Sequence, residues 1–290
     1  MLHPPSAIEL QSCRQTRAPE RQGFAGRLCL HTKGCPRTFE VLSWHAACSA
    51  TSMKYKCAVI TPLLNSNVIV RETYESLAPQ LSADLCWFVK NSCVDSANVL
   101  NFLKEQQHIS YVEQPDSSLY EALNQALGLV DADFYVVLGA GDRLTAHAAS
   151  VLLACIAQFT ANHAFFFAAK RYPIDLTFLP RPEFLTAFMS TPHPGALLKV
   201  ENSIEIGGYD VRYKIAADYD HLCRYTQRFP ICGKNDFVLT NYLGGGISES
   251  RQLEGYIESS LVRLRVCNAL QGNEARGLQR GLPLFMTPTA

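Results

Sequence analysis

From residue 54 onward, the pattern of apolar and polar positions predicts strands and helices that alternate along the chain. A short apolar run at 56–61, closed by Pro62, predicts a buried strand. The clearest helical pattern covers 119–130, where apolar residues return at every third or fourth position. Strands that alternate with helices of this length favour βαβ units, so we expect a single-domain α/β fold with a mostly parallel sheet flanked by helices.

The same criteria predict the other elements of this sheet. Further strands are expected at 85–89, 109–112, 134–138, 164–169, 195–200 and 237–243. Further helices are expected at 67–81, after Asp95, before the strand at 164, at 216–228 and at 249–270. The last of these would be a long terminal helix.

Polar residues follow four of the predicted strands, at the edge where parallel sheets bind their ligands. The clearest case is Gly139-Ala140-Gly141-Asp142, because Asp142 follows a fully apolar strand and gains nothing from packing there. Mg²⁺ typically combines one or two carboxylates with phosphate oxygens of a substrate. This position therefore suits a nucleoside diphosphate that a metal ion bridges to the protein.

Each of these polar residues also has a purely structural explanation. A Gly-Asp turn after a strand is common turn chemistry, and Asp116 can be a turn residue in the same way. Asp95 can serve as a helix cap. His193, between two prolines, can be an ordinary loop histidine. These alternatives stay open at the level of the sequence.

The first 52 residues differ from the rest of the chain. They show no sustained strand or helix period, and they carry six basic against three acidic residues. Met53 follows directly. We therefore expect 1–52 to be a disordered leader or a start-site artefact, with a bound regulatory arm as the alternative.

Composition narrows the classes of function. The 26 Lys and Arg residues equal the 26 Asp and Glu residues, so nucleic acid is not an expected partner. No apolar run reaches the roughly 18 residues that span a bilayer, and the first thirty residues lack a secretory apolar region. The 11 cysteines form no C-x-x-C pair. They favour reduced thiols in a cytoplasmic protein without a transmembrane helix.

Seven short segments occur in an order and at spacings typical of one enzyme family. They are Val59–Pro62, Phe88–Asp95, Glu113–Asn124, Gly139–Asp142, His193–Ala196, Gly207–Asp210 and Ala216–Asp220. Together they resemble the family 2 glycosyltransferases, and most closely their polysaccharide-biosynthesis branch. The resemblance covers about residues 54–248.

The resemblance implies a GT-A fold in 53–248, followed by a C-terminal helix and tail in 249–290. The family's D-x-D metal site corresponds to 140–142, so Asp142 is expected to bind a divalent cation, Mn²⁺ or Mg²⁺. Asp218 falls where the family places its catalytic base, and Asp220, two residues on, would point elsewhere. Positions expected to bind the donor are Thr61, Pro62, Asn65, Asn91, Asp95, Asp116, Asn124 and His193.

The implied reaction is an inverting, metal-dependent hexosyl transfer. A nucleotide sugar would donate the sugar to a glycan or lipid-linked acceptor in cell-surface polysaccharide biosynthesis. The enzyme would act in the cytoplasm, and peripheral association with the inner face of the membrane stays open.

Two other functions compete with this interpretation. A nucleotidyltransferase would usually place a Gly-rich, basic loop after the first strand, whereas 62–66 contains neither Gly nor Lys. A catalytically degenerate homologue that binds a nucleotide sugar or a partner enzyme is favoured by the eroded segment Lys90–Asp95, where Asn91 stands near the usual base-contacting Asp. Intact Asp142 and Asp218 argue against it.

Overall fold

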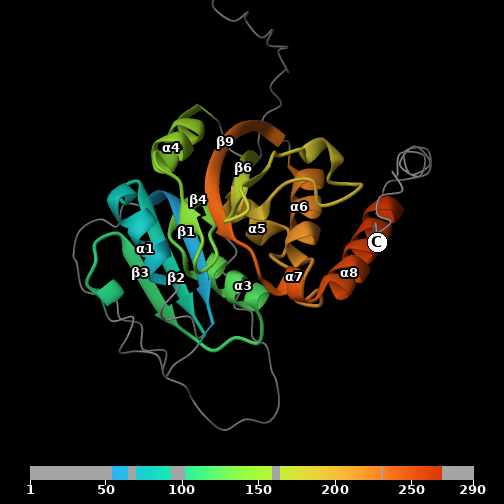
Figure 1. The fold of residues 1–290 in the computed structure, drawn as a ribbon, viewed down its shortest axis with the longest axis horizontal. Helices are drawn as coiled ribbons and strands as arrows, with labels where there is room; N and C mark the ends of the chain where they lie inside the picture. The colour runs from blue at the N-terminus through green and yellow to red at the C-terminus, as the bar shows by residue number, and fades with distance from the viewer. Residues whose placement is uncertain (1–53, 65–69, 93–101, 159–163, 230, 270–290) are drawn as a thin grey trace, which may run out of the picture. The chain divides into compact units, whose positions relative to one another are not determined.

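The structure, a computed structural model, describes residues 54–64, 70–92, 102–158, 164–229 and 231–269 (Figure 1). The expectations for 1–52, Asn65 and Asp95 lie outside these residues. The described residues belong to one compact unit.

A parallel sheet forms the first half of this unit. Its four strands lie in the order β3-β2-β1-β4, and every neighbouring pair is parallel. β2 and most of β1 and β4 are buried on both faces, which explains why they are short, nearly continuous apolar runs in the sequence, whereas the edge strand β3 is only partly buried. Their bounds are Tyr55–Leu63 for β1, Leu85–Asn91 for β2, Ile109–Glu113 for β3 and Ala132–Val137 for β4.

The second half continues the sheet with mixed pairing. β8 joins β4 and β6 through antiparallel pairs, β9 runs parallel to β6, and β5 and β7 add antiparallel partners. The predicted class, a mostly parallel α/β sheet flanked by helices, is confirmed. The bounds are Arg143–Leu144 for β5, Ala164–Tyr172 for β6, Leu176–Phe178 for β7, Ala196–Lys199 for β8 and Ile231–Leu243 for β9.

Helices cover both faces of this sheet (Figure 1). The α-helices are α1 (Val70–Leu77), α3 (Leu119–Leu129), α4 (Ala148–Gln158), α5 (Val200–Glu205), α6 (Ala217–Arg228), α7 (Ile247–Ser250) and α8 (Gln252–Ala269). The part of the chain that the structure describes also contains three short 3₁₀ helices, η1 (Ala78–Gln80), η3 (Pro182–Phe184) and η4 (His193–Gly195). Among the described residues, no helix is both long enough and apolar enough to cross a bilayer.

Two hydrophobic cores lie on the two faces of the sheet. Successive side chains of β1 alternate between them, so Ile60 packs with α3 and α6 while Val59 packs with α1 and α4. Val262 and Val266 of α8 are buried in the first core. The C-terminal helix therefore shares a core with the elements that carry the family-like motifs.

The structure differs from the predicted elements in several places: helix α5 at Val200–Glu205 was not predicted, and β9 begins at Ile231, before the strand expected at 237–243. The helix expected at 249–270 is interrupted at Arg251, whose backbone is not helical, and this divides it into α7 and α8. The two-residue strand β5 and the three-residue strand β7 carry too few residues for a period to be visible in the sequence.

Candidate functional site

The turn that carries Asp142 is held by helix α1. The hydroxyl of Thr73 accepts a hydrogen bond from Gly141 N at 2.9 Å and donates one to Asp142 O at 2.8 Å. One turn later, Ser76 Oγ accepts a bond from Leu144 N at 3.1 Å. The polar stripe of α1 therefore fixes the backbone on both sides of the Asp142 side chain.

Among the described residues, backbone N–H groups are the hydrogen-bond partners of the Asp142 carboxylate. Oδ2 accepts from Gly139 N at 3.1 Å, and Oδ1 accepts from Leu243 N at 2.7 Å. A Cβ at position 139 would lie 2.6 Å from Oδ2, so the turn requires glycine there. Burial raises the pKa of Asp142 to about 6, although the hydrogen bonds from Leu243 N and Gly139 N lower this pKa.

We expect Thr73→Val to destabilise this turn. Valine has nearly the same shape but leaves the Gly141 N–H and the Asp142 carbonyl without their bonds, which costs about 1–3 kcal/mol for a buried unpaired group. Urea unfolding measures the loss. Thr73→Ser keeps the hydroxyl and should retain most of the stability; equal midpoints for Val and wild type would contradict the role of the hydroxyl.

A buried ion pair lies at the carboxyl ends of β2 and β3. Lys90 has no exposed side-chain surface, and its Nζ lies 2.8 Å from Asp116 Oδ2. The same Nζ donates to the carbonyl of Gln114. Asp116 was expected to bind the donor; in the structure its charge is compensated by Lys90, a residue with which sequence reasoning did not pair it.

The neighbouring donor-binding candidates also have protein partners. Asn91 is buried and donates from Nδ2 to the hydroxyl of Tyr111 at 2.8 Å. Thr61 is fully buried, and its hydroxyl accepts from Trp87 Nε1 at 2.8 Å. Pro62 lies opposite Lys90 in the β1–β2 register. These residues do occupy the predicted edge of the sheet.

Asp218 lies in the first turn of α6. Its Oδ1 accepts from Tyr219 N at 2.8 Å and lies 3.4 Å from the hydroxyl of Tyr120, which itself donates to Ile215 O. Burial raises the pKa of Asp218 above its ordinary value, and the nearby His193 opposes this shift. The carboxylate is thus desolvated and has few compensating charges.

His193 begins a chain of buried polar side chains. Its Nε2 lies 2.9 Å from the hydroxyl of Tyr209, which lies 3.3 Å from the hydroxyl of Tyr135. That hydroxyl lies 3.2 Å from Nε2 of His221, a ring whose Nδ1 is 3.1 Å from Gly208 O. Burial lowers the pKa of His221 to about 3, so its ring is neutral, and Nδ1 donates to the carbonyl.

Asn124 clamps this region rather than facing open space. Its Nδ2 donates to Tyr209 O at 2.8 Å, and its Oδ1 accepts from Tyr209 N at 2.7 Å. A Cβ at Gly208, whose φ is +67°, would lie 2.3 Å from Oδ1. Both polar ends of the Asn124 amide are thus used to join α3 to the loop before α6.

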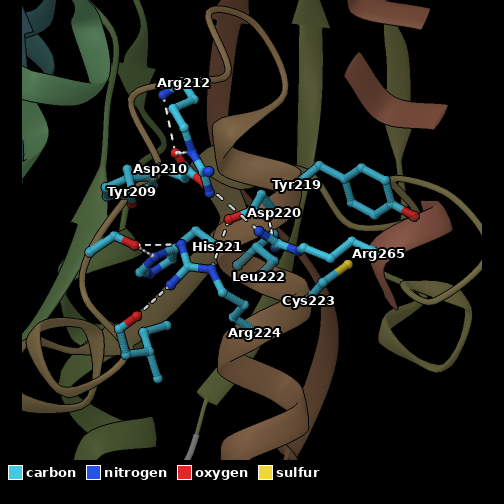
Figure 2. Close-up of polar contacts among 12 residues, drawn as sticks. Tyr209, Asp210, Arg212, Tyr219, Asp220, His221, Leu222, Cys223, Arg224 and Arg265 are labelled. Carbon is cyan, nitrogen blue, oxygen red and sulfur yellow. Dashed lines mark hydrogen bonds and ion pairs between the residues drawn. The ribbon is translucent and has the colours of Figure 1, made fainter. Parts of the chain in front are cut away.

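Asp220 points away from Asp218, as expected from their spacing. Figure 2 shows its fully buried carboxylate between Arg224 of the same helix and Arg265 of α8. Arg224 Nε donates to Oδ2 at 2.8 Å, and the guanidinium also donates to Ile206 O and Gly208 O at 2.6 Å each. Asp220 therefore joins α6 to α8.

The structure thus forms three groups of candidate residues. Lys90, Asn91 and Asp116 gather at one strand edge, Asp142 lies in its own turn, and Asp218 lies with Tyr120 and His193. The three residues between Asp116 and Tyr120 are too few to separate the first group widely from the third.

Comparisons with known proteins bear on the fold. No protein-family model and no curated protein matches the chain. Residues 1–349 of S. aureus TarS in complex with UDP-GlcNAc match with a TM-score of 0.61 and 13% identity, over 76% of this chain and 69% of that one. In a longer structure of the same TarS protein, the match covers 41% of the TarS chain.

A second similar structure is the mannosyltransferase PcManGT from Pyrobaculum calidifontis in complex with GDP-Man and Mn²⁺. Its TM-score is 0.52 and its identity 13%, with 79% of each chain covered. The chain has a GT-A fold. The comparisons support this fold, and at such identities the roles of individual residues remain predictions.

The carboxylate of Asp142 could serve as one ligand of a divalent cation. Within the described residues, no group of three or more His, Cys, Asp or Glu side chains is placed to hold a metal alone. Asp142 is a desolvated carboxylate bonded by two backbone amides, and each oxygen keeps a second lone pair. This suits a cation that takes its other ligands from a diphosphate and water.

Several residues of this site were not predicted. Tyr120 lies within a recognised segment, yet nothing in the sequence indicates that its hydroxyl reaches the carbonyl of Ile215. Thr73 could have been found from the spacing of Thr73, Ser76 and Gln80, because these positions share one face of a helix.

Proposed function

We propose that this chain is a family 2 glycosyltransferase. It would transfer a hexosyl group with inversion from a nucleotide sugar to a glycan or lipid-linked acceptor in cell-surface polysaccharide biosynthesis. The observation that carries the proposal is the desolvated carboxylate of Asp218 at the start of α6, beside His193, on a GT-A sheet. The free thiols of Cys57, Cys86, Cys155 and Cys223 fit the cytoplasm.

The reaction follows from the chemistry of Asp218. The carboxylate takes the proton of the acceptor hydroxyl while the oxygen attacks the anomeric carbon from the face opposite the leaving group. A new carbon–oxygen bond forms, and the bond to the diphosphate breaks with its electron pair. Because burial raises the pKa of Asp218, the carboxylate is a stronger base than an exposed aspartate.

His193 and Tyr120 would position this base. The Tyr120 hydroxyl and the backbone of Tyr219 approach the same carboxylate oxygen, which leaves Oδ2 for the acceptor hydroxyl. Lys90, Asn91 and Asp116 would contact the nucleotide through the edge that they form. Asp142 would hold the divalent cation, which supplies positive charge to the departing diphosphate.

We expect Asp142→Asn to weaken metal-dependent binding of a nucleoside diphosphate. An amide lacks the charge that a hard cation requires, so the gain in affinity on adding Mn²⁺ should shrink about tenfold or more. Titration calorimetry with UDP and GDP, with and without Mn²⁺, measures this. Asp133→Asn, at an exposed ion pair with Lys54, is the control; unchanged metal dependence in the Asp142 variant would remove Asp142 from the site.

The function itself is tested with nucleotide sugars. UDP-GlcNAc and GDP-Man, present in the two similar structures, are the first donors to try, with release of UDP or GDP as the readout. Slow hydrolysis needs no knowledge of the acceptor because water takes its place. Binding of a donor would raise Tm by mass action even without turnover. A chain that neither binds nor hydrolyses any nucleotide sugar would contradict the proposal.

A homologue that binds a nucleotide sugar without turnover is the second candidate. The buried pair Lys90–Asp116 favours it. In one possible alignment with the family motif, Lys90 stands at the position where a carboxylate would contact the base of the nucleotide. This candidate would be selected if the wild type binds a nucleotide sugar but neither hydrolyses nor transfers it. Asp218→Asn should then leave this binding unchanged.

A further inference from the structure

Helix α8 lies beyond all the family-like motifs, and it contacts the start of α6. The carboxylate of Glu258 accepts hydrogen bonds from three consecutive backbone N–H groups. Oε1 accepts from Lys214 at 2.9 Å, and Oε2 accepts from Ile215 at 2.8 Å and Ala216 at 2.9 Å. Three backbone bonds to one carboxylate hold this segment in a single conformation.

The segment that leads into α6 gains no bond from the N-cap side chain of that helix. Its N-cap residue, Ala216, has no side chain that can bond the first N–H groups of the helix. Glu258 provides an acceptor from another helix and places negative charge near the positive end of α6. Within the helix, Asp218 bonds the N–H of Tyr219, whereas the segment 214–216 that leads into the helix depends on α8.

The same segment is held from its other side. Tyr120 of α3 donates to the carbonyl of Ile215, while Glu258 binds the N–H of the same residue. Gly255, one turn before Glu258, lies so close that a Cβ there would be 3.2 Å from Ile215 Cγ2. Residue 215 is thus fixed by two helices, three residues before Asp218.

The distal part of α8 is anchored independently. Arg265 forms an ion pair with buried Asp220 of α6, and Val262 and Val266 are buried in the core. These contacts set the register of α8 against α6. Glu258, four and eight residues before the two valines, is thereby placed over the backbone of 214–216.

We infer that Glu258 is a positioning residue for Asp218 and that α8 forms part of the catalytic apparatus. This inference rests on the proposed function of Asp218. Loss of the Glu258 carboxylate would free the segment 214–216 that leads into α6. A shift of about 1 Å in the carboxylate of Asp218 is enough to lower a rate up to about 10²-fold. Donor binding, which uses the strand edge and Asp142, should change little.

The test compares three variants of the full chain. Glu258→Ala removes all three bonds, whereas Glu258→Gln keeps a carbonyl oxygen that can accept from Ile215 and Ala216. Glu254→Ala, one turn earlier on α8, removes only an exposed pair with Arg251 and is the matched control. Release of UDP from UDP-GlcNAc and of GDP from GDP-Man gives kcat and KM for each variant.

The expected result is a loss in kcat of about 10- to 100-fold for Glu258→Ala, with donor KM within about twofold. Glu258→Gln should lie between Ala and wild type, and Glu254→Ala should equal wild type. A Glu258→Ala variant with the wild-type kcat would overturn the inference. If that variant does not fold, Glu258→Gln decides in the same way, because it must lose part of kcat at unchanged KM.

Hydrogen exchange separates this inference from the proposed function. In Glu258→Ala the amides of 214–216 should exchange faster, while those around Asp142 keep their wild-type rates. If the wild type hydrolyses no donor, the proposed function fails, and exchange still decides whether Glu258 holds the start of α6. Unchanged exchange at 214–216 would overturn the inference whatever the activity.

Discussion

Asp218→Asn is expected to lower turnover by about 10²–10⁴-fold, the usual contribution of a general base. Asparagine keeps the oxygen that accepts from Tyr219 N, so the fold and donor binding should persist. Hydrolysis of UDP-GlcNAc or GDP-Man measures the rate, and calorimetry with UDP or GDP measures binding. Near-normal turnover in this variant would exclude Asp218 as the base.

The same substitution should raise stability at neutral pH. The pKa of Asp218 is raised in the folded state by burial, so its contribution to stability is full below the unfolded pKa and is lost as the pH rises through the folded pKa. At pH 7, above the unfolded pKa, the titration of Asp218 therefore lowers the stability of the fold, and asparagine removes this loss. Calorimetric unfolding should show a higher Tm for the variant at pH 7, with the difference smaller near pH 4.

Asp210→Asn is the matched control for Asp218. Asp210 lies a few residues before α6, but Arg212 binds its carboxylate through two nitrogens and holds its pKa below the usual range. A carboxylate with a lowered pKa is a weak base, so its loss should change turnover by less than about threefold. A larger loss at Asp210 than at Asp218 would reverse the two roles.

The sequence predicts the first half of the fold well because the apolar residues of each element there follow a clear helical or strand pattern. Strand β2 is buried along its whole length, and α3 has its apolar residues on one face, so both patterns are strong. β5 and β7 are held by pairing with distant strands, and neither has a period of its own. The break at Arg251 likewise has no proline or glycine at that position to mark it.

In the candidate site, too, some residues can be predicted from local sequence patterns and others cannot. Asp142 and Asp218 can be found because each stands in a short motif next to a predictable element. The groups that hold them come from far along the chain: Thr73 lies 68 residues before Gly141, and Glu258 lies 43 residues after Ile215. Such pairings depend on tertiary packing, which no local pattern contains. Lys90 was visible in the sequence, but its pairing with Asp116 required the β2–β3 register.

Asp220→Asn is expected to cause the largest loss of stability among single substitutions near α6. Both oxygens of this fully buried carboxylate are paired, one with Arg224 and the other with Arg265 (Figure 2). An amide would direct an N–H group toward one guanidinium and leave the remaining charges uncompensated. Removing one partner from a buried ion pair costs about 3 kcal/mol or more, which corresponds to roughly 6–12 °C in Tm for a chain of this size.

Urea unfolding measures the Asp220 effect as a lower midpoint at an unchanged slope. Glu205→Gln is the control, because its ion pair with Arg228 is exposed on both sides and contributes at most about 1 kcal/mol. Since Asp220 joins α6 to α8, the amides of α8 should exchange faster in Asp220→Asn than in Glu205→Gln. A midpoint for Asp220→Asn equal to that of the control would show that the arginines are satisfied without Asp220, and that α8 is held by Val262, Val266 and Glu258 instead.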